Sequence, residues 1–115
     1  MDCSCVNKLP PIYKGDDATI KFMVEHPDGS YMNFNGKTIK FIVKKEKTET
    51  DVEAVISKTL EPVTDIHELD IVLSSTETNI TPNVYWFGIR IIDNNYQTTE
   101  AEGKLEIKQG PFYAD

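Results

Sequence analysis

His67, Glu68 and Asp70 are the residues of this chain whose types and spacing most suggest acid–base chemistry. An imidazole beside carboxylates can supply a general base and a group that orients it. In a strand, however, His67 would face away from Glu68 and Asp70, on the same side as Leu69 at a core edge. The sequence also shows no serine or cysteine nucleophile with a suitable base, and no glycine-rich phosphate loop. It therefore predicts a protein that is not an enzyme and has no catalytic residues.

Oxygen ligands for calcium could come from two acidic stretches. Asp16-Asp17 is the first, and Glu49, Asp51 and Glu53 form the second. Neither stretch has the alternating ligands and the glycine of an ordered calcium loop. Acidic loops on an acidic protein are usually solvated, so we expect no bound metal and no cofactor.

Two cysteines lie near the start of the sequence, as Cys3-Ser4-Cys5. A metal site would need further ligands, and the two histidines, His26 and His67, are distant and lie in different strand contexts. Residues so close in sequence would also strain a mutual disulfide. We expect residues 1–11 to be a flexible tail with free thiols.

The β-strands that must position any site are predicted by apolar residues that recur with a period of two. Apolar residues occupy every second position in run after run, and turn signals such as Asp28-Gly29 and Asn35-Gly36 separate the runs. This alternation puts the apolar side chains on one face of each strand, with Phe41 and Phe87 in the core. A small all-β sandwich is predicted, with a short edge strand and turn at 12–16 and further strands near 17–25, 31–34, 37–45, 54–60, 66–73, 84–92 and 97–108.

The alternation of apolar residues is interrupted at Ser74-Ser75-Thr76-Glu77-Thr78. A serine or threonine followed by a glutamate is typical of a helix N-cap, so we expect one short helical turn near 75–79. The domain should cover residues 12–109, with residues 110–115 as a C-terminal tail after Gly110-Pro111.

Composition excludes several partners. The chain has 115 residues, 39% of them hydrophobic, and a net charge of −7. One domain of this size can build a core without disulfides. The negative charge argues against nucleic acid or an anionic membrane as the main partner. No apolar stretch is long enough to span a bilayer and no secretory signal is visible, so folding in a cytoplasm is expected.

One segment departs from simple alternation, because both faces of residues 84–92 are apolar. Val84, Trp86 and Ile92 share the second face with Gly88 and Arg90, and a strand of this kind is covered on both sides. Tryptophan and arginine are also enriched at interface hot spots, so Val84, Trp86, Arg90 and Ile92 are the predicted partner interface. The alternative is cover by the same chain, with Leu9 or with Phe112 and Tyr113 folded back over Trp86.

Several stretches resemble one family in the same order along residues 12–108. They are Ile12-Tyr13-Lys14-Gly15-Asp16, Asp28-Gly29-Ser30, Phe34-Asn35-Gly36-Lys37-Thr38-Ile39-Lys40-Phe41, Val84-Tyr85-Trp86-Phe87-Gly88-Ile89 and Ala101-Glu102-Gly103-Lys104-Leu105-Glu106-Ile107. The chain resembles the Ig-like N-terminal domain of phage baseplate upper proteins and related small prophage proteins. The resemblance implies an Ig-like antiparallel β-sandwich of about seven to eight strands. It supplies no catalytic residues.

The function implied by the resemblance is structural. We expect a virion protein, made and folded in the bacterial host cytoplasm, that contacts other baseplate or tail proteins and forms a dimer or trimer with itself. One alternative is a carbohydrate- or receptor-binding module, for which Tyr31, Tyr96 and Tyr113 would have to group on one loop rim. Another is a capsid decoration or head-fibre protein. No nucleic acid and no membrane are expected as partners.

Overall fold

Seven strands make up nearly all the regular structure of residues 9–46 and 53–110, the part of the chain that the computed structural model describes. The all-β class predicted from the alternation is confirmed. No helix within these ranges is long and apolar enough to cross a membrane. The strands are β1 (Ile12–Tyr13), β2 (Ala18–Phe22), β3 (Thr38–Lys44), β4 (Ile56–Leu60), β5 (Leu69–Leu73), β6 (Asn83–Asp93) and β7 (Tyr96–Lys108).

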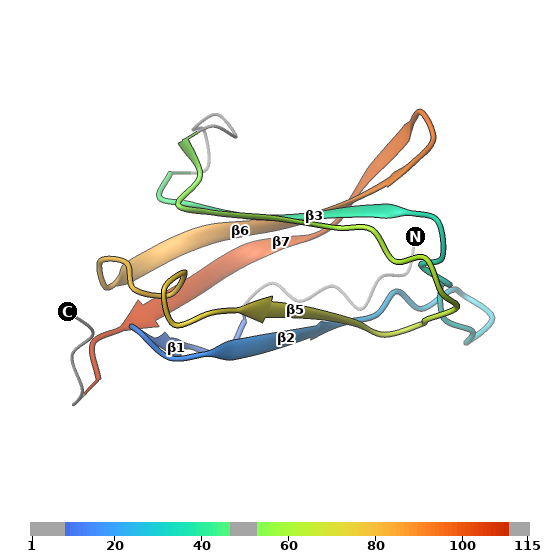
Figure 1. Ribbon diagram of the computed structural model, residues 1–115. Helices are drawn as coiled ribbons and strands as arrows, with labels where there is room; N and C mark the ends of the chain where they lie inside the picture. Colours follow the sequence, from blue (N-terminus) through green and yellow to red (C-terminus); the bar gives the residue numbers. More distant parts are fainter. Residues whose placement is uncertain (1–8, 47–52, 111–115) are drawn as a thin grey trace.

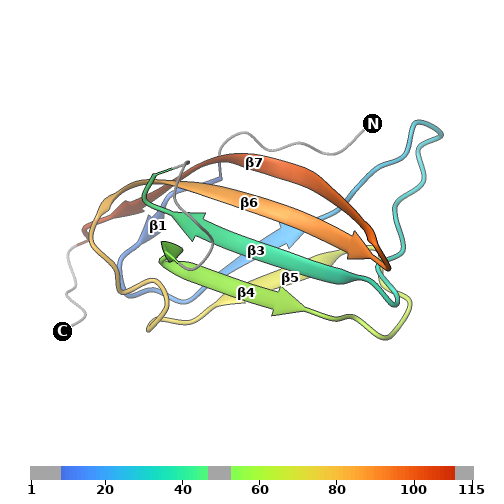
Figure 2. The ribbon, with the colours of Figure 1, turned by 90° about the horizontal axis from the view of Figure 1, so that it is seen from above.

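The strands form two layers (Figure 1). The larger sheet has the order β1-β7-β6-β3-β4, and the smaller sheet is the antiparallel pair β2-β5. Figure 2 shows β7, β6, β3 and β4 side by side in the larger sheet, with β2 and β5 behind them. The far end of the β6–β7 hairpin curls away from the smaller sheet (Figure 1). The smaller sheet thus covers one face of the larger sheet and leaves the other face outside the core.

The core between the layers is built by the predicted alternation. Phe41 and Phe87 were expected in it and are 0% and 3% exposed, with ring centroids 6.4 Å apart. Tyr85, Ile89 and Ile91 of β6 are buried beside them. Side chains on one face of each strand therefore meet in a single apolar cluster, as period-two patterning requires.

One strand pair corrects the expectation of a purely antiparallel sandwich. β1 runs parallel to β7, with Ile12 opposite Ile107 and Tyr13 opposite Lys108. A parallel pair needs a long connection between its strands, and here nearly the whole domain lies between β1 and β7. The pairing is extended at both ends, since Leu9 N–H donates to Lys104 O (3.1 Å) and Lys14 N–H to Lys108 O (2.8 Å).

The strand expected at 31–34 is not formed; the pairing there is a single bridge between Glu25 and Tyr31. Met32 N–H still donates to Val24 O (2.8 Å), but the backbone hydrogen bonds beyond it go to a neighbouring loop. Phe34 N–H donates to Ile66 O and Gly36 N–H donates to Pro62 O, both at 2.9 Å. Beyond Met32, loop partners thus replace the ladder that a strand would need.

The helical turn expected near 75–79 is present as one turn, closed by Thr78 N–H donating to Ser74 O (3.0 Å). Glu77 N–H donates to Ser74 Oγ (3.2 Å), and Ser74 N–H donates to Glu77 Oε1 (2.9 Å). This reciprocal pair is a capping box, with Ser74 as the N-cap.

The start of the packed domain lies at or before Leu9. Leu9 is 6% exposed and belongs to the core cluster, three residues before the expected boundary at Ile12. Cys3 and Cys5 lie outside the described residues, as do Phe112 and Tyr113.

Candidate functional site

The outward face of β6 is the face on which the interface was predicted. Trp86, Gly88, Arg90 and Ile92 alternate with the buried residues of the strand. Pairing with β3 and β7 places each of them in a row across three strands. The rows are Lys44, Trp86 and Lys104; Ile42, Gly88 and Glu102; Lys40, Arg90 and Thr99; and Thr38, Ile92 and Gln97.

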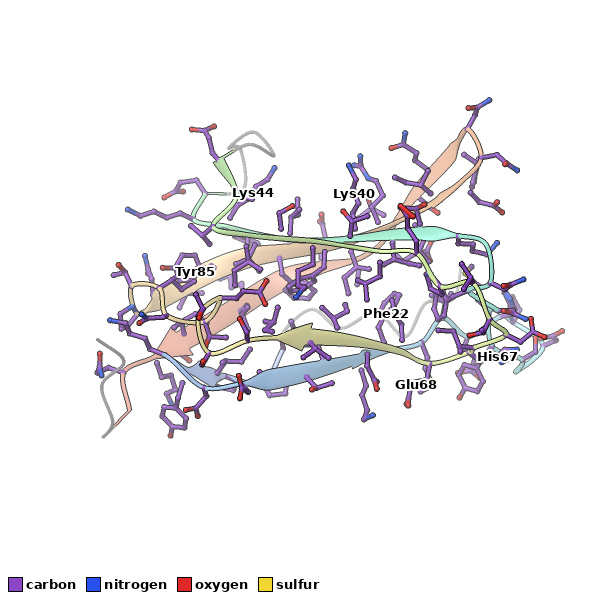
Figure 3. The ribbon with its side chains drawn as sticks, in the orientation of Figure 1. Phe22, Lys40, Lys44, His67, Glu68 and Tyr85 are labelled. Carbon is purple, nitrogen blue, oxygen red and sulfur yellow. The ribbon has the colours of Figure 1, made fainter. Side chains whose placement is uncertain are left out.

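These rows enclose a hollow of about 350 Å³, which we call the outer-face hollow. Gly88 lies in the middle of it, and the missing side chain leaves open space between Trp86 and Arg90. The outward side chains that line it are Lys40, Ile42 and Lys44 of β3, Trp86, Arg90 and Ile92 of β6, and Gln97, Thr99 and Glu102 of β7. Lys40 and Lys44 point away from the smaller sheet (Figure 3). The hollow combines apolar walls with charged side chains.

Three of the four predicted interface residues, Trp86, Arg90 and Ile92, line this hollow. Val84 lies farther along the same strand, opposite Glu106, and is 48% exposed. The residues of β3 and β7 were not predicted. The alternation within β3 does place Lys40 and Ile42 on the outward face of that strand. It does not predict which strands lie beside β3 in the sheet.

Trp86 is half-buried within this face. The Nζ of Lys104 lies 5.4 Å from the centroid of its ring, a cation–π contact. Leu9, one of the side chains proposed to cover Trp86, packs in the core instead. The indole is therefore fixed beside a cation, with part of its surface accessible.

Arg90 is exposed at the other side of Gly88, and its Nη1 donates to Gln97 Oε1 (3.4 Å). This contact holds the guanidinium over the sheet, where its planar donors can pair with a carboxylate. Trp86 and Arg90 are thus presented on the same rigid strand, four residues apart.

The group that first suggested catalysis is a surface ion-pair cluster. Lys21 Nζ lies 3.3 Å from Asp70 and 3.6 Å from Glu68, and the hydrogen bond from Lys21 to Asp70 raises the pKa of Lys21. His67 is exposed and precedes β5, so it does not lie at the core edge where it was expected. Figure 3 shows His67 and Glu68 at the loop end of the molecule, away from the outer-face hollow.

The first acidic stretch has a structural role. Asp17 Oδ1 accepts a hydrogen bond from Ser75 N–H (2.7 Å), and the carbonyl of Asp16 accepts one from Thr78 Oγ1 (2.6 Å). Both residues tie β2 to the 74–78 turn. No group of three or more His, Cys, Asp or Glu side chains within residues 9–46 and 53–110 is placed to hold a metal ion. Glu49 and Asp51 lie outside those ranges.

A second hollow, of about 590 Å³, lies beside Tyr85 between Lys14 and Lys45. The Tyr85 hydroxyl donates to Thr81 O, and burial raises the pKa of Tyr85. The phenol of Tyr85 is thus held by a hydrogen bond, and Lys14 and Lys45 are charged side chains that line the same hollow.

Comparisons with protein-family models, with curated proteins and with solved structures found no match for this chain. A fold class alone does not define a function, so the function has to be inferred from the residues of the site.

Proposed function

We propose that this protein is a non-enzymatic structural module of a phage virion that acts through protein–protein contacts at the tail baseplate. The observation that carries the binding role is the outer-face hollow, in which Trp86, Arg90 and Ile92 lie together on the face of the larger sheet that points away from the smaller sheet. The virion location is supported by the resemblance of residues 12–108 to the Ig-like domain of baseplate upper proteins.

The architecture of the hollow suits binding. Its side chains come from three paired strands, β3, β6 and β7, so their positions are fixed by backbone hydrogen bonds before a partner arrives. Preorganised side chains lose less entropy on association than loop side chains. Tryptophan and arginine beside apolar surface are the residue types that carry most of the energy at protein interfaces.

The rival functions predict different arrangements. A sugar-binding module should group aromatic side chains on one rim, but Tyr31 follows the 26–30 turn and Tyr96 begins β7 at the β6–β7 turn. Tyr113 lies outside the described residues. A capsid decoration or head-fibre protein would use the same binding chemistry at the head, so location is the property that separates it from a baseplate module.

Location is tested on purified particles. Immunogold labelling of this protein should mark the tail end of virions produced by the host. Labels on the head would favour the capsid alternative, and absence of the protein from the particles by mass spectrometry would contradict a virion role.

The binding role is tested by Trp86→Ala. Removal of the indole should weaken association with neighbouring virion proteins, or with other copies of the chain, by about 2 kcal/mol or more. Light scattering over a dilution series and pull-down of the proteins encoded nearby are the measurements. Val72→Ala is the matched control, because Val72 is exposed on the opposite sheet. Equal association of the parent and Trp86→Ala would show that this face is not the interface.

A further inference from the structure

The charge of the outer-face hollow is opposite to that of the molecule. The chain has 12 lysines and arginines against 19 aspartates and glutamates. Among the residues that the structure describes, the lining of the hollow has three basic side chains, Lys40, Lys44 and Arg90, and one acidic side chain, Glu102. Lys104 adds a fourth cation beside Trp86. Lys40, Arg90 and Lys104 are the cations used below. Arg90 contacts Gln97 and Lys104 contacts the Trp86 ring. Lys44 and Glu102 interact with further groups of the chain.

This charge argues against a symmetric pairing of two such faces. In a two-fold dimer each patch meets its own copy, so cations around Trp86 would meet cations. Like charges brought together at an interface cost several kcal/mol, which the apolar area of one tryptophan does not readily offset. The face is therefore complementary to a surface unlike itself.

The shape of the hollow favours an extended occupant. Its lining follows β6 from Trp86 to Ile92, a length of about 20 Å at roughly 3.3 Å per residue. Side chains of an extended segment point to one face at every second residue, the same spacing as the outward rows of β6. One apolar side chain would fit over Gly88 between Trp86 and Ile92, and flanking carboxylates would meet Lys40, Arg90 and Lys104.

We infer that the outer-face hollow binds an acidic, extended segment of a partner protein, in which every second side chain faces the hollow and these side chains are a carboxylate, an apolar group and a second carboxylate in turn. The inference rests on the proposed binding function and names the chemistry of the partner. Arg90 pairs with a carboxylate of that segment, and Trp86 contacts its apolar side chain. The net charge of −7 slows the approach of any polyanion, so specificity comes from short-range contacts within the hollow.

The test uses the intrinsic fluorescence of Trp86, which is the only tryptophan of the chain and so reports on this site alone. The probe is a synthetic peptide of about eight residues that contains the sequence Glu-Ser-Val-Ser-Glu and in extended form spans the hollow. Its two glutamates and its valine lie on one face of the extended chain. Titration of the full-length protein should shift or quench the emission. The same peptide with lysine in place of each glutamate should give no such change. Raising the salt from about 0.1 M to about 1 M should weaken binding, because the Debye length falls from about 10 Å to about 3 Å.

Two variants locate the binding. Arg90→Gln should lower the affinity for the acidic peptide about tenfold. Lys21→Gln, which removes the same charge from the outer face of β2, should change it less than about twofold. Gly88→Val fills the middle of the hollow and should abolish binding. A Cβ at residue 88 would lie 3.8 Å from Ile42 Cγ1, an ordinary contact, so this variant should keep the β-sheet circular dichroism of the parent.

Four results of the binding experiments would overturn the inference, and a fifth result concerns self-association. The four are no binding of the acidic peptide, equal binding of the basic peptide, affinity unchanged by both Arg90→Gln and Gly88→Val, and tighter binding of an oligothymidine than of the acidic peptide. A Trp86 signal that depends on protein concentration alone would identify a second copy as the occupant and would also overturn it. If Trp86→Ala abolishes association with virion proteins while the acidic peptide fails to bind, the proposed function stands and only the partner chemistry is wrong.

Discussion

Glu77 joins the 74–78 turn to β4 of the larger sheet. Its Oε1 accepts hydrogen bonds from Ser74 N–H (2.9 Å) and from Lys58 Nζ (3.0 Å). Lys58 Nζ also donates to Val72 O (2.8 Å), so one lysine of the larger sheet reaches the smaller sheet and the 74–78 turn. The hydrogen bond from Ser74 N–H is the main cause that lowers the pKa of Glu77 below its ordinary value. Burial of the carboxyl raises this pKa, and Lys58 lowers it further.

Glu77→Gln should therefore change how stability depends on pH. A carboxyl whose pKa is lower in the folded state stabilises the protein above its unfolded pKa, near 4.5, and this stability is lost as the pH falls through the folded pKa. At neutral pH the variant should lose on the order of 1 kcal/mol of unfolding free energy. Thermal melts of both proteins should converge as the solution is acidified below pH 4.5. A difference that stays constant with pH would contradict this role of the carboxylate.

Phe41→Ala tests the assignment of the strand faces. Phe41 is fully buried against Phe87, so its truncation should cost about 3–5 kcal/mol, a large part of the stability of a small domain. Ile42→Ala is the control, because Ile42 is the next residue of β3 but faces the outer-face hollow, and it should cost about 1 kcal/mol. Denaturant unfolding gives both values. A larger loss for Ile42→Ala than for Phe41→Ala would mean that the two faces are exchanged.

Among the elements, the β6–β7 hairpin depends on one unusual backbone position. Asp93 pairs with Tyr96, so Asn94 and Asn95 form the turn, and Asn94 has a φ of 57°. Asparagine and glycine tolerate this left-handed conformation better than other residues. Asn94→Ala should lower the unfolding free energy by about 1 kcal/mol, whereas Asn94→Gly should leave it nearly unchanged. Calorimetric melting of the two variants distinguishes them, and equal losses would point to a role for the asparagine side chain instead of its backbone.

Within an element, period-two alternation was enough to predict structure. It put Phe87 on the core face of β6 and Trp86 and Arg90 on the opposite face, as the burial of these residues confirms. The Ser74–Glu77 capping box was also readable, because both of its partners lie within one turn of chain. Predictions succeeded where the deciding contacts are local.

Contacts between distant elements were the part that the sequence could not supply. Lys40 and Glu102 reach the outer-face hollow because β3 and β7 flank β6, which local patterning does not determine. A register shift in β7, where Ile89 pairs with Ala101 and Arg90 with Thr99, leaves one extra residue and breaks the alternation. The segment at 31–34 has the composition of a strand, but beyond Met32 its backbone bonds to a loop.

At the scale of the whole molecule, the charges are unevenly distributed. The chain is acidic, with a net charge of −7, yet the outer-face hollow on its larger sheet gathers cations around Trp86. The smaller sheet carries the carboxylates of Glu68 and Asp70 on its own outer face, around Lys21. The outer faces of the two sheets thus differ in charge, so a partner protein can distinguish one face from the other.

The parallel pairing of β1 with β7 has a mechanical consequence. Because the two strands run in the same direction, tension applied before β1 and after β7 pulls on opposite ends of the pair. The hydrogen bonds from Leu9 to Lys104 and from Lys14 to Lys108 then carry the load together, in shear, instead of opening one after another. Stretching of single molecules held at the two chain ends should therefore show a pronounced force peak before the sheet yields. Ile12→Pro, which bends the chain at the pair, should lower that peak. In a protein that connects moving parts of a larger assembly, the two residues of β1 would thus increase the resistance to mechanical unfolding.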